Sequence, residues 1–384
     1  MGADGILLAA AGQAWETNAL ELLAAAQRPV LKRCVDLTDL LASAATGQAA
    51  IAVLSEKLMG LDADAVIRLK RAEVRPIVVG EQDLTGIGIT DFVPVDRIDE
   101  LLGQIEASAP NPSVLDPEPP DVLPQTNASG RVVVVHGANG APGRSLIGTT
   151  IAALRARDSP TVLLDLDPQA GSVAQSLGVL DEVSGLLAAA RLANNGALDS
   201  PSFARCRRRI NPGLDVLTGL PRSDRWMEVR AGAVPRILEL SREVGDVVVD
   251  AGSSLEDDTD VSRSVGRNQT TIDAVAEADS IVLVGGAEPV GLSRLTRSLV
   301  GLREVTPVPV HVVINRMRDS LGWKRSDIQD LITTYAEPTT ITFVPLDLAG
   351  VDRSMVQGKS LVEVGNSPIL KALEPLLTLV FDPS

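Results

Sequence analysis

Short apolar runs alternate with amphipathic stretches along the first 105 residues of the chain. The amphipathic stretches 16–26 and 63–71 carry apolar residues at the three- and four-residue spacing of helices. Apolar runs of strand length lie between such stretches, and this alternation is typical of a parallel sheet covered by helices. We therefore expect a five-stranded doubly wound α/β domain over residues 1–105, with strands at 6–9, 29–32, 51–54, 77–79 and 92–94.

The same alternation continues over residues 130–384. A strand, crossover and parallel strand connect in a right-handed sense, so the pattern predicts a second, larger and mostly parallel α/β domain. Residues 106–129 are dense in proline and poor in large apolar side chains, which predicts an extended linker between the two. The expected strands of the second domain lie at 132–135, 162–164, 214–217, 247–249, 281–284, 310–314 and 342–344.

Composition narrows the classes of protein that remain. Hydrophobic residues make up 45% of the 384 residues but aromatic residues only 2%, so the cores must be aliphatic. The formal net charge of −15 argues against a general nucleic-acid binder, because neutralising phosphates dominates such binding. Cys34 and Cys206 are far apart in sequence, which predicts reduced thiols and a cytoplasmic protein. The apolar run 5–11 has no basic residue before it, so we expect a strand there, not a signal peptide, and no segment is long enough to span a bilayer.

Residues 136–156, HGANGAPGRSLIGTTIAALRA, connect the strand at 132–135 to a helix through a glycine-rich turn. A strand, such a turn and a helix start bind phosphate together, because backbone N–H groups converge on the anion and the helix dipole favours its charge. The turn satisfies two nucleotide-binding templates in part. Gly137, Gly140 and Gly143 give the spaced glycines of a dinucleotide-binding turn.

The second template is the P-loop. Gly143, Arg144 and Ser145 match its end, with arginine in place of lysine, while Ala138 stands where the first glycine belongs. Asp165 follows the turn at about the distance at which a dinucleotide fold places its ribose-binding acid. The loop alone therefore leaves both readings open.

Acidic residues at two strand ends favour the P-loop. The sequence VLLDLDPQ at 162–169 supplies Asp167 in addition to Asp165, and a dinucleotide fold leaves that second acid unexplained. A P-loop protein needs another acidic strand end at the Mg²⁺ water shell, and Asp250 in GDVVVDAG supplies it. A short-chain reductase would need a lysine four residues after its tyrosine, but the chain's one tyrosine, Tyr335, is followed there by Thr339.

Residues 130–384 resemble the deviant-Walker-A ATPases of the MinD/ParA class. The resemblance implies an α/β fold of the P-loop NTPase type, with a doubly wound, mostly parallel sheet, preceded here by a smaller receiver-like (flavodoxin-like) domain. Its landmarks occur in order at 137–145, VLLDLDPQ at 162–169, DVVVDAG at 246–252, VVINR at 312–316, VPLD at 344–347 and GKSLVEV at 358–364.

The N-terminal domain resembles the receiver domains of two-component signalling, chiefly over VLSEKLMGLDADAVIRLKR after the third strand. Its reactive positions are replaced. Ser55 stands at the place of the phospho-accepting Asp, Ala10 and Ala11 near the acidic pair, and Val93 at the place of the Lys before Pro94. Without clustered carboxylates there is no Mg²⁺ site, so we expect a pseudo-receiver that docks partners. A pseudo-receiver and linker before the ATPase resemble the CpaE/TadZ branch, which is associated with Tad-type pilus assembly and polar placement.

The resemblance implies ATP and Mg²⁺ as cofactors. Arg144 would reach the β- and γ-phosphates, Asp167 would position the attacking water, and Asp250 would be the Walker B acid. Asn315 and Arg316 fall where the class contacts adenine, although Asn315 also suits a strand-end turn. The implied cofactor-binding residues are Gly137, Asn139, Gly140, Ala141, Pro142, Gly143, Arg144, Ser145, Leu146, Asp250, Asn315 and Arg316; the catalytic residues are Asp167 and Arg144; and the metal ligands are Ser145, Asp167 and Asp250, the acids through water.

Two departures from the class predict weak catalysis. Asn139 replaces the signature lysine that reaches across the dimer, and Arg144 replaces the catalytic lysine. Arginine keeps the charge but presents a bulky planar fork, so the exchange is not conservative. By analogy with the ~10³–10⁵ attributed to an arginine finger, we expect ATP to be bound and hydrolysed slowly or not at all. Pro142 stiffens the loop because its φ is fixed.

Three further features concern partners. The arginines at 205 and 207–209 suit either a solvated face or a contact with DNA or an acidic partner. The acidic stretch 253–268 is either inert or, as in the class, a region that meets partners. The C-terminal LKALEPLLTLVFDPS has an internal proline and little positive charge, so membrane association is expected to be indirect.

We therefore expect a nucleotide-modulated homodimer that binds proteins of the pilus or division machinery and is recruited by them to the pole or inner membrane face. DNA binding is not expected. The rival functions are a ParA-type partition or septum-site ATPase and a nucleotide-free scaffold with a vestigial P-loop.

Overall fold

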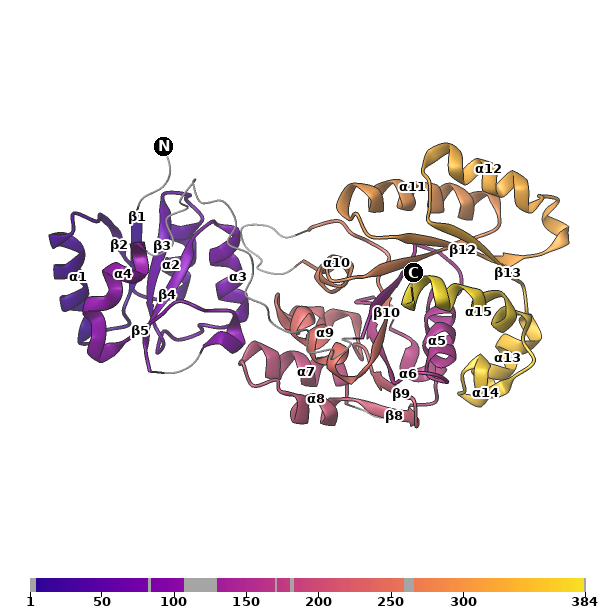
Figure 1. Ribbon diagram of the computed structural model, residues 1–384, viewed down its shortest axis with the longest axis horizontal. Helices are drawn as coiled ribbons and strands as arrows, with labels where there is room; N and C mark the ends of the chain where they lie inside the picture. Colours follow the sequence, from indigo (N-terminus) through magenta and orange to yellow (C-terminus); the bar gives the residue numbers. More distant parts are fainter. Residues whose placement is uncertain are drawn as a thin grey trace, which may run out of the picture. The chain divides into compact units, whose positions relative to one another are not determined.

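The computed structural model describes residues 5–81, 84–106, 130–169, 171–179, 183–258 and 266–382. They form two units, one built on a five-stranded sheet and the other on an eight-stranded sheet (Figure 1). Apart from Glu106, the predicted linker at 106–129 lies outside the described residues, and so do residues 259–265 of the acidic stretch.

All strand pairs of the first sheet are parallel, in the order β2-β1-β3-β4-β5, which is the flavodoxin-like order. Both faces of the sheet are covered, because alternate side chains of each strand join different hydrophobic clusters. Leu7 packs with residues of α2 and α3, whereas Ile6 and Leu8 pack with residues of α1 and α4. The elements are β1 (Gly5–Ala9), α1 (Trp15–Ala25), β2 (Val30–Arg33), α2 (Leu37–Ala44), β3 (Ala49–Ser55), α3 (Ala63–Arg71), β4 (Arg75–Gly80), η1 (Thr85–Ile87), β5 (Phe92–Pro94), η2 (Val95–Glu100) and α4 (Leu101–Glu106).

The second sheet has the order β13-β12-β11-β6-β10-β7-β9-β8, and every pair is parallel except β8 with β9. Its strands are β6 (Val132–His136), β7 (Thr161–Leu166), β8 (Arg208–Asn211), β9 (Leu214–Leu217), β10 (Asp246–Ala251), β11 (Ser280–Gly286), β12 (Val310–Met317) and β13 (Thr340–Pro345). Its helices are α5 (Arg144–Arg155), α6 (Val173–Ser176), α7 (Gly185–Asn194), α8 (Ser200–Cys206), η3 (Ser223–Glu228), α9 (Ala233–Val244), α10 (Gln269–Ala276), α11 (Pro289–Val305), η4 (Asp319–Leu321), α12 (Arg325–Tyr335), α13 (Leu348–Gln357), α14 (Leu361–Val364) and α15 (Pro368–Phe381).

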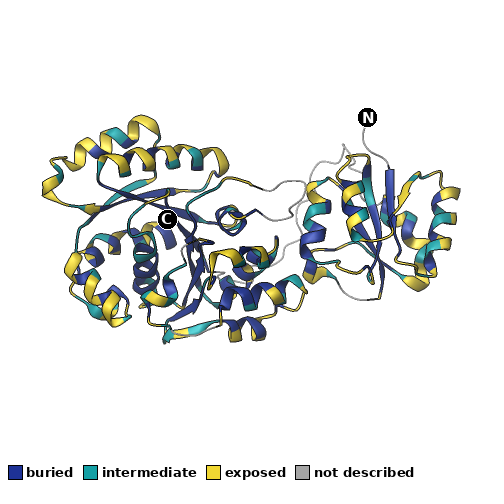
Figure 2. Ribbon diagram, turned by 180° about the vertical axis from the view of Figure 1, so that it is seen from behind, coloured by how far each residue is buried: buried dark blue, intermediate teal, exposed yellow. Residues whose placement is uncertain are grey.

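Helices α5, α14 and α15 pack on one face of this sheet and form a single aliphatic cluster with it. The interior strands are buried along their whole length (Figure 2), and most of their residues are apolar, as expected where both faces of a sheet are covered. The C-terminal helix α15 contributes Leu373, Leu376 and Val380 to this core, although Pro375 lies within it. None of the described helices has the length and apolar character needed to cross a membrane.

Every predicted strand overlaps an observed strand, but β8 was not predicted. Its sequence, RRIN, has no apolar alternation, so nothing in the pattern indicates a strand. Pairing with β9 at the sheet edge stabilises it, and Asp215 of β9 accepts hydrogen bonds from Arg207 and Arg209. The basic cluster therefore includes the edge strand itself.

Candidate functional site

The carboxyl ends of three neighbouring strands meet at one edge of the larger sheet. In register, Asp250 of β10 lies opposite Val135 of β6 on one side and Asp165 of β7 on the other. Asp167 follows directly after β7. This edge is where parallel sheets place their ligands, since the loops after adjacent strands converge there.

The glycine-rich loop connects β6 to α5 over this edge. Gly140 and Gly143 adopt left-handed φ values of 77° and 79°, which side chains other than glycine rarely tolerate. Gly143 is the N-cap of α5 and provides no side-chain cap, so the first N–H groups of the helix face the loop without one. These N–H groups and the helix dipole make the loop a site for an anion.

Asn315, at the end of β12, braces this loop. Its side-chain Nδ2 donates to the Pro142 carbonyl at 2.8 Å, and its Oδ1 accepts from the Arg316 N–H at 2.8 Å. A Cβ at Gly143 would lie 2.5 Å from the same Nδ2, so the brace requires glycine there. Both the oxygen and the nitrogen of the buried Asn315 side-chain amide are therefore hydrogen-bonded within the protein.

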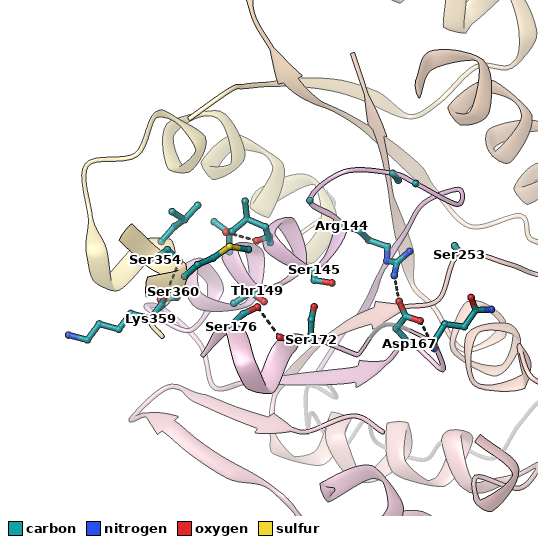
Figure 3. A pocket seen from close by; sticks show the side chains of 18 of the residues that line it. Arg144, Ser145, Thr149, Asp167, Ser172, Ser176, Ser253, Ser354, Lys359 and Ser360 are labelled. Atoms are coloured by element: carbon teal, nitrogen blue, oxygen red, sulfur yellow. Dashed lines mark hydrogen bonds and ion pairs between the residues drawn. The ribbon is translucent and has the colours of Figure 1, made fainter. Parts of the chain in front are cut away.

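Arg144 turns toward the acidic strand ends. Its Nη2 donates to Asp167 Oδ2, and its Nε lies 3.5 Å from Asp250 Oδ1 (Figure 3 shows the pair with Asp167). The side chains of Arg144, Asp167 and Asp250 are 12%, 3% and 0% exposed. The second oxygen of Asp167 accepts from the Gln169 N–H at 2.9 Å. One guanidinium thus contacts two buried carboxylates.

Burial controls the protonation of this cluster. Burial raises the pKa of Asp250, although Arg144 and the Ser145 hydroxyl oppose the rise. Burial and the charge of Asp250 raise the pKa of Asp165, whose Oδ2 accepts from the Val173 N–H at 3.2 Å. Asp167 and Asp250 therefore share one arginine, while burial holds the neighbouring Asp165 toward its neutral form.

His136 at the end of β6 is buried and neutral. Burial lowers the pKa of its imidazole to about 4. Its Nδ1 lies 2.8 Å from the Gly252 carbonyl, which can only accept, so Nδ1 carries the proton. The ring therefore connects the ends of β6 and β10, and the structure gives it no metal partner among the described residues.

A cavity of about 370 Å³ opens beside the loop and continues along α5 to α6, α13 and α14. Its volume is at the lower end of the range for small-molecule sites. The predicted residues that line it are Asn139, Gly140, Ala141, Gly143, Arg144, Ser145, Leu146 and Asp167. Those that do not are Gly137, Pro142, Asp250, Asn315 and Arg316.

The five residues outside the lining have other structural contacts. Gly137 allows close packing, because a Cβ there would lie 2.6 Å from the Val284 carbonyl oxygen. The Asn315 side chain donates to the Pro142 carbonyl, and Asp250 is fully buried and does not line the cavity. Arg316 adopts a left-handed φ of 61° near the end of β12. This conformation agrees with the alternative expectation that Asn315 belongs to a turn at the end of the strand.

Eleven residues that line the cavity were not among the predicted site residues: Thr149, Thr150, Gln169, Ser172, Ser176, Ser253, Ser354, Met355, Lys359, Ser360 and Leu361. The motif GKSLVEV at 358–364 marked three of them as a landmark, but no role was attached to them. The loops beyond α6 and α13 touch through glycines, since a Cβ on Gly358 would lie 2.9 Å from the Gly178 Cα. This contact joins the two far walls of the cavity.

The donor set fits a nucleotide with Mg²⁺. The Ser145 hydroxyl and the Asp167 and Asp250 carboxylates are the hard oxygen ligands that Mg²⁺ prefers, and Mg²⁺ commonly binds through one or two carboxylates together with phosphates. The buried oxygens of Asp250 accept no hydrogen bond of ordinary geometry from the described residues. No group of three or more His, Cys, Asp or Glu side chains in the described part of the chain could hold a metal alone.

A glycine-rich loop after β6, an uncapped helix behind it and acidic ends on β7 and β10 are features expected of the P-loop NTPase fold. Comparison with solved structures agrees with this fold. The ParA family ATPase from Chlorobium tepidum TLS superposes with a TM-score of 0.54 at 17% identity, covering 64% of this chain and 98% of that one.

Two further solved structures are similar to the chain at the same level. The Pyrococcus furiosus cell division ATPase MinD gives a TM-score of 0.52 at 16% identity, over 65% of this chain and 97% of that one. The septum site-determining protein MinD from Pyrococcus horikoshii OT3, solved with Mg-ADP, gives a TM-score of 0.52 at 14% identity. The match covers 65% of this chain and 96% of that one. No protein-family model and no curated protein sequence matches the chain.

At these identities the likeness shows the fold. The chain is an α/β protein with mostly parallel sheets, and its larger unit has the P-loop NTPase fold of the MinD and ParA ATPases. The fold class predicted from the sequence is confirmed.

Proposed function

We propose that the chain is an ATP-binding positioning switch of the MinD/ParA kind that binds ATP with Mg²⁺ and hydrolyses it slowly or not at all. The observation that carries this proposal is the uncapped start of α5, which lies behind two left-handed glycines and opens into a cavity beside Asp167 and Asp250. Ser145 and the two acids would hold the metal, and the loop N–H groups would hold the phosphates.

The orientation of Arg144 supports slow hydrolysis. Its guanidinium is neutralised by Asp167 and Asp250, so its charge is not directed at the loop. In the proposed reaction Asp167 would orient the attacking water, yet here it is held by Arg144 and the Gln169 N–H. Both groups would have to change partners before phosphoryl transfer.

Calorimetry with ATP and Mg²⁺ tests the proposal directly. We expect the wild-type chain to bind, and Gly143→Ala to lose most of that affinity because a Cβ at this left-handed residue would strike Asn315. Gly148→Ala on α5 is the matched control, because its Cβ would meet neighbours only at 3.6 Å and beyond. Wild-type protein that binds no ATP would favour the nucleotide-free scaffold.

The proposal extends to the domain organisation. Residues 1–105 would be a docking pseudo-receiver, 106–129 the linker and 130–384 the ATPase. The end of β3 supports this, since Ser55 is 1% exposed and its Oγ accepts from the Lys57 N–H at 3.1 Å, so the hydroxyl is withdrawn from solvent. Such a unit would bind a protein without being phosphorylated.

We place the switch with pilus assembly of the Tad/CpaE type, acting as a nucleotide-modulated homodimer on partners of the pilus or division machinery. A pull-down with and without ATP tests this, and nucleotide-dependent capture of pilus components is the expected result. Capture of septum or partition components would favour the rival positioning functions. Capture that does not change with ATP would favour the scaffold.

A further inference from the structure

Arg144 and Asp167 line the cavity, and together with the buried Asp250 they form a group of one guanidinium and two carboxylates. Arg144 contacts Asp167 through Nη2 and Asp250 through Nε, so different nitrogens of one planar fork engage different acids. The two acids come from neighbouring strands, β7 and β10, whose register fixes their spacing. The guanidinium therefore lies among the same oxygens that would hold Mg²⁺.

Asp250 shows how much this contact matters. Its side chain is fully buried, its oxygens accept no ordinary hydrogen bond from the described residues, and Arg144 is the cation paired with it there. A buried charge without compensation is strongly unfavourable. The position of Arg144 is therefore set by the acids and not by the glycine-rich loop.

We infer that Arg144 is an internal counter-cation that occupies the Asp167–Asp250 pair in the nucleotide-free protein and excludes divalent cations from it. Phosphate bound at the loop draws the guanidinium away, and the two carboxylates then become available to Mg²⁺. The second half of this exchange rests on the proposed function, whereas the first half concerns the free protein alone. Nucleotide and divalent cation thus enter the site together, because each requires Arg144 to leave the acids.

Titration of the nucleotide-free protein with Mn²⁺ tests the first half. Mn²⁺ shares the oxygen-ligand preference of Mg²⁺, and its free concentration is read by electron paramagnetic resonance. We expect wild-type protein to bind Mn²⁺ weakly, and Arg144→Ala to bind one equivalent at least about tenfold more tightly, since a positive charge in contact with the site is removed. Adding Asp250→Asn to Arg144→Ala should abolish the gain.

Arg207 provides the matched control. It pairs with the buried Asp215 at 3.0 Å and is 10% exposed, much like Arg144, but only one carboxylate is present and Arg209 also contacts it. Arg207→Ala should therefore leave Mn²⁺ binding unchanged. If Arg144→Ala fails to fold, Arg144→Gln carries the same expectation, because it removes the charge and keeps polar contacts. Equal Mn²⁺ binding by wild type and both Arg144 variants overturns the inference.

A parallel titration with ATP present separates the two proposals. If wild-type protein takes up Mn²⁺ only with ATP, the exchange is supported. If ATP does not bind, the proposed function fails while the nucleotide-free titration still decides the role of Arg144. If ATP binds but the Arg144 variants gain no Mn²⁺ affinity, only the counter-cation inference fails.

Discussion

Two adjacent threonines on α5 differ in how their hydroxyls are used. Thr150 Oγ1 donates to the Leu146 carbonyl at 2.6 Å, whereas the buried Thr149 Oγ1 has no hydrogen-bond partner among the described residues. Both side chains line the cavity. A buried hydroxyl without a partner is unfavourable, and functional sites are where such groups persist.

Valine substitutions should separate the two threonines. We expect Thr149→Val to be at least as stable as the wild type, because it removes an unpartnered hydroxyl and keeps the shape. Thr150→Val should lose about 1 kcal/mol of unfolding free energy with its hydrogen bond. Urea denaturation measures both, and equal losses would contradict the assignment.

His311 should make stability depend on pH. Burial lowers the pKa of its imidazole to about 4, from 6.5 in the unfolded chain. Between these values the unfolded state binds a proton that the folded state does not, so stability falls as the pH falls, by up to about 1.4 kcal/mol per pH unit. Above that window the histidine has no such effect.

His311→Gln should lose this dependence, because glutamine does not titrate. The check is urea denaturation of both proteins across the window, comparing the difference in unfolding free energy at each pH. His136 is present in both proteins, so its contribution cancels in the difference between their unfolding free energies. Parallel curves for the two proteins would show that His311 is not buried in its neutral form.

At the scale of elements, strand ends were predictable and side-chain directions were not. Apolar runs that end in Asp165 and Asp250 place both acids at one sheet edge, and the register confirms that they are opposite each other. The partners of Arg144 depend on which of its rotamers the two acids stabilise, and sequence does not encode this locally. The cavity wall formed by α13 and α14 was missed because these helices lie more than two hundred residues from the loop along the chain.

The edge strand β8 makes another prediction at this scale. Asp215 is 8% exposed and holds Arg207, so Asp215→Asn leaves a buried arginine without its counter-ion. We expect a loss of about 2–4 kcal/mol in unfolding free energy. Asp224→Asn is the control, because the Arg222–Asp224 pair is mostly exposed and should contribute nothing measurable. Similar losses in the two variants would argue against a structural role for the buried pair.

At the scale of the whole molecule, charge distinguishes the rival functions. The net charge is −15, and part of the arginine cluster at 205–209 is already paired with Asp215. We expect no retardation of duplex DNA by the protein at low salt, with or without ATP, since binding would require many phosphate contacts. A salt-dependent shift would instead favour a partition ATPase.

The glycine contact between residues 178 and 358 has a practical consequence. Both residues adopt left-handed φ values, and their backbones leave no room for a methyl group. The glycine contact therefore fixes the spacing of the cavity walls at this end. Met355, which is 58% exposed, lines the same cavity, and no close backbone contact restricts the size of its side chain. If the chain binds ATP as proposed, replacing Met355 by alanine would widen the cavity for a nucleotide analogue with a bulky substituent. An engineered copy could then be addressed chemically in a cell while ordinary ATPases ignore the compound.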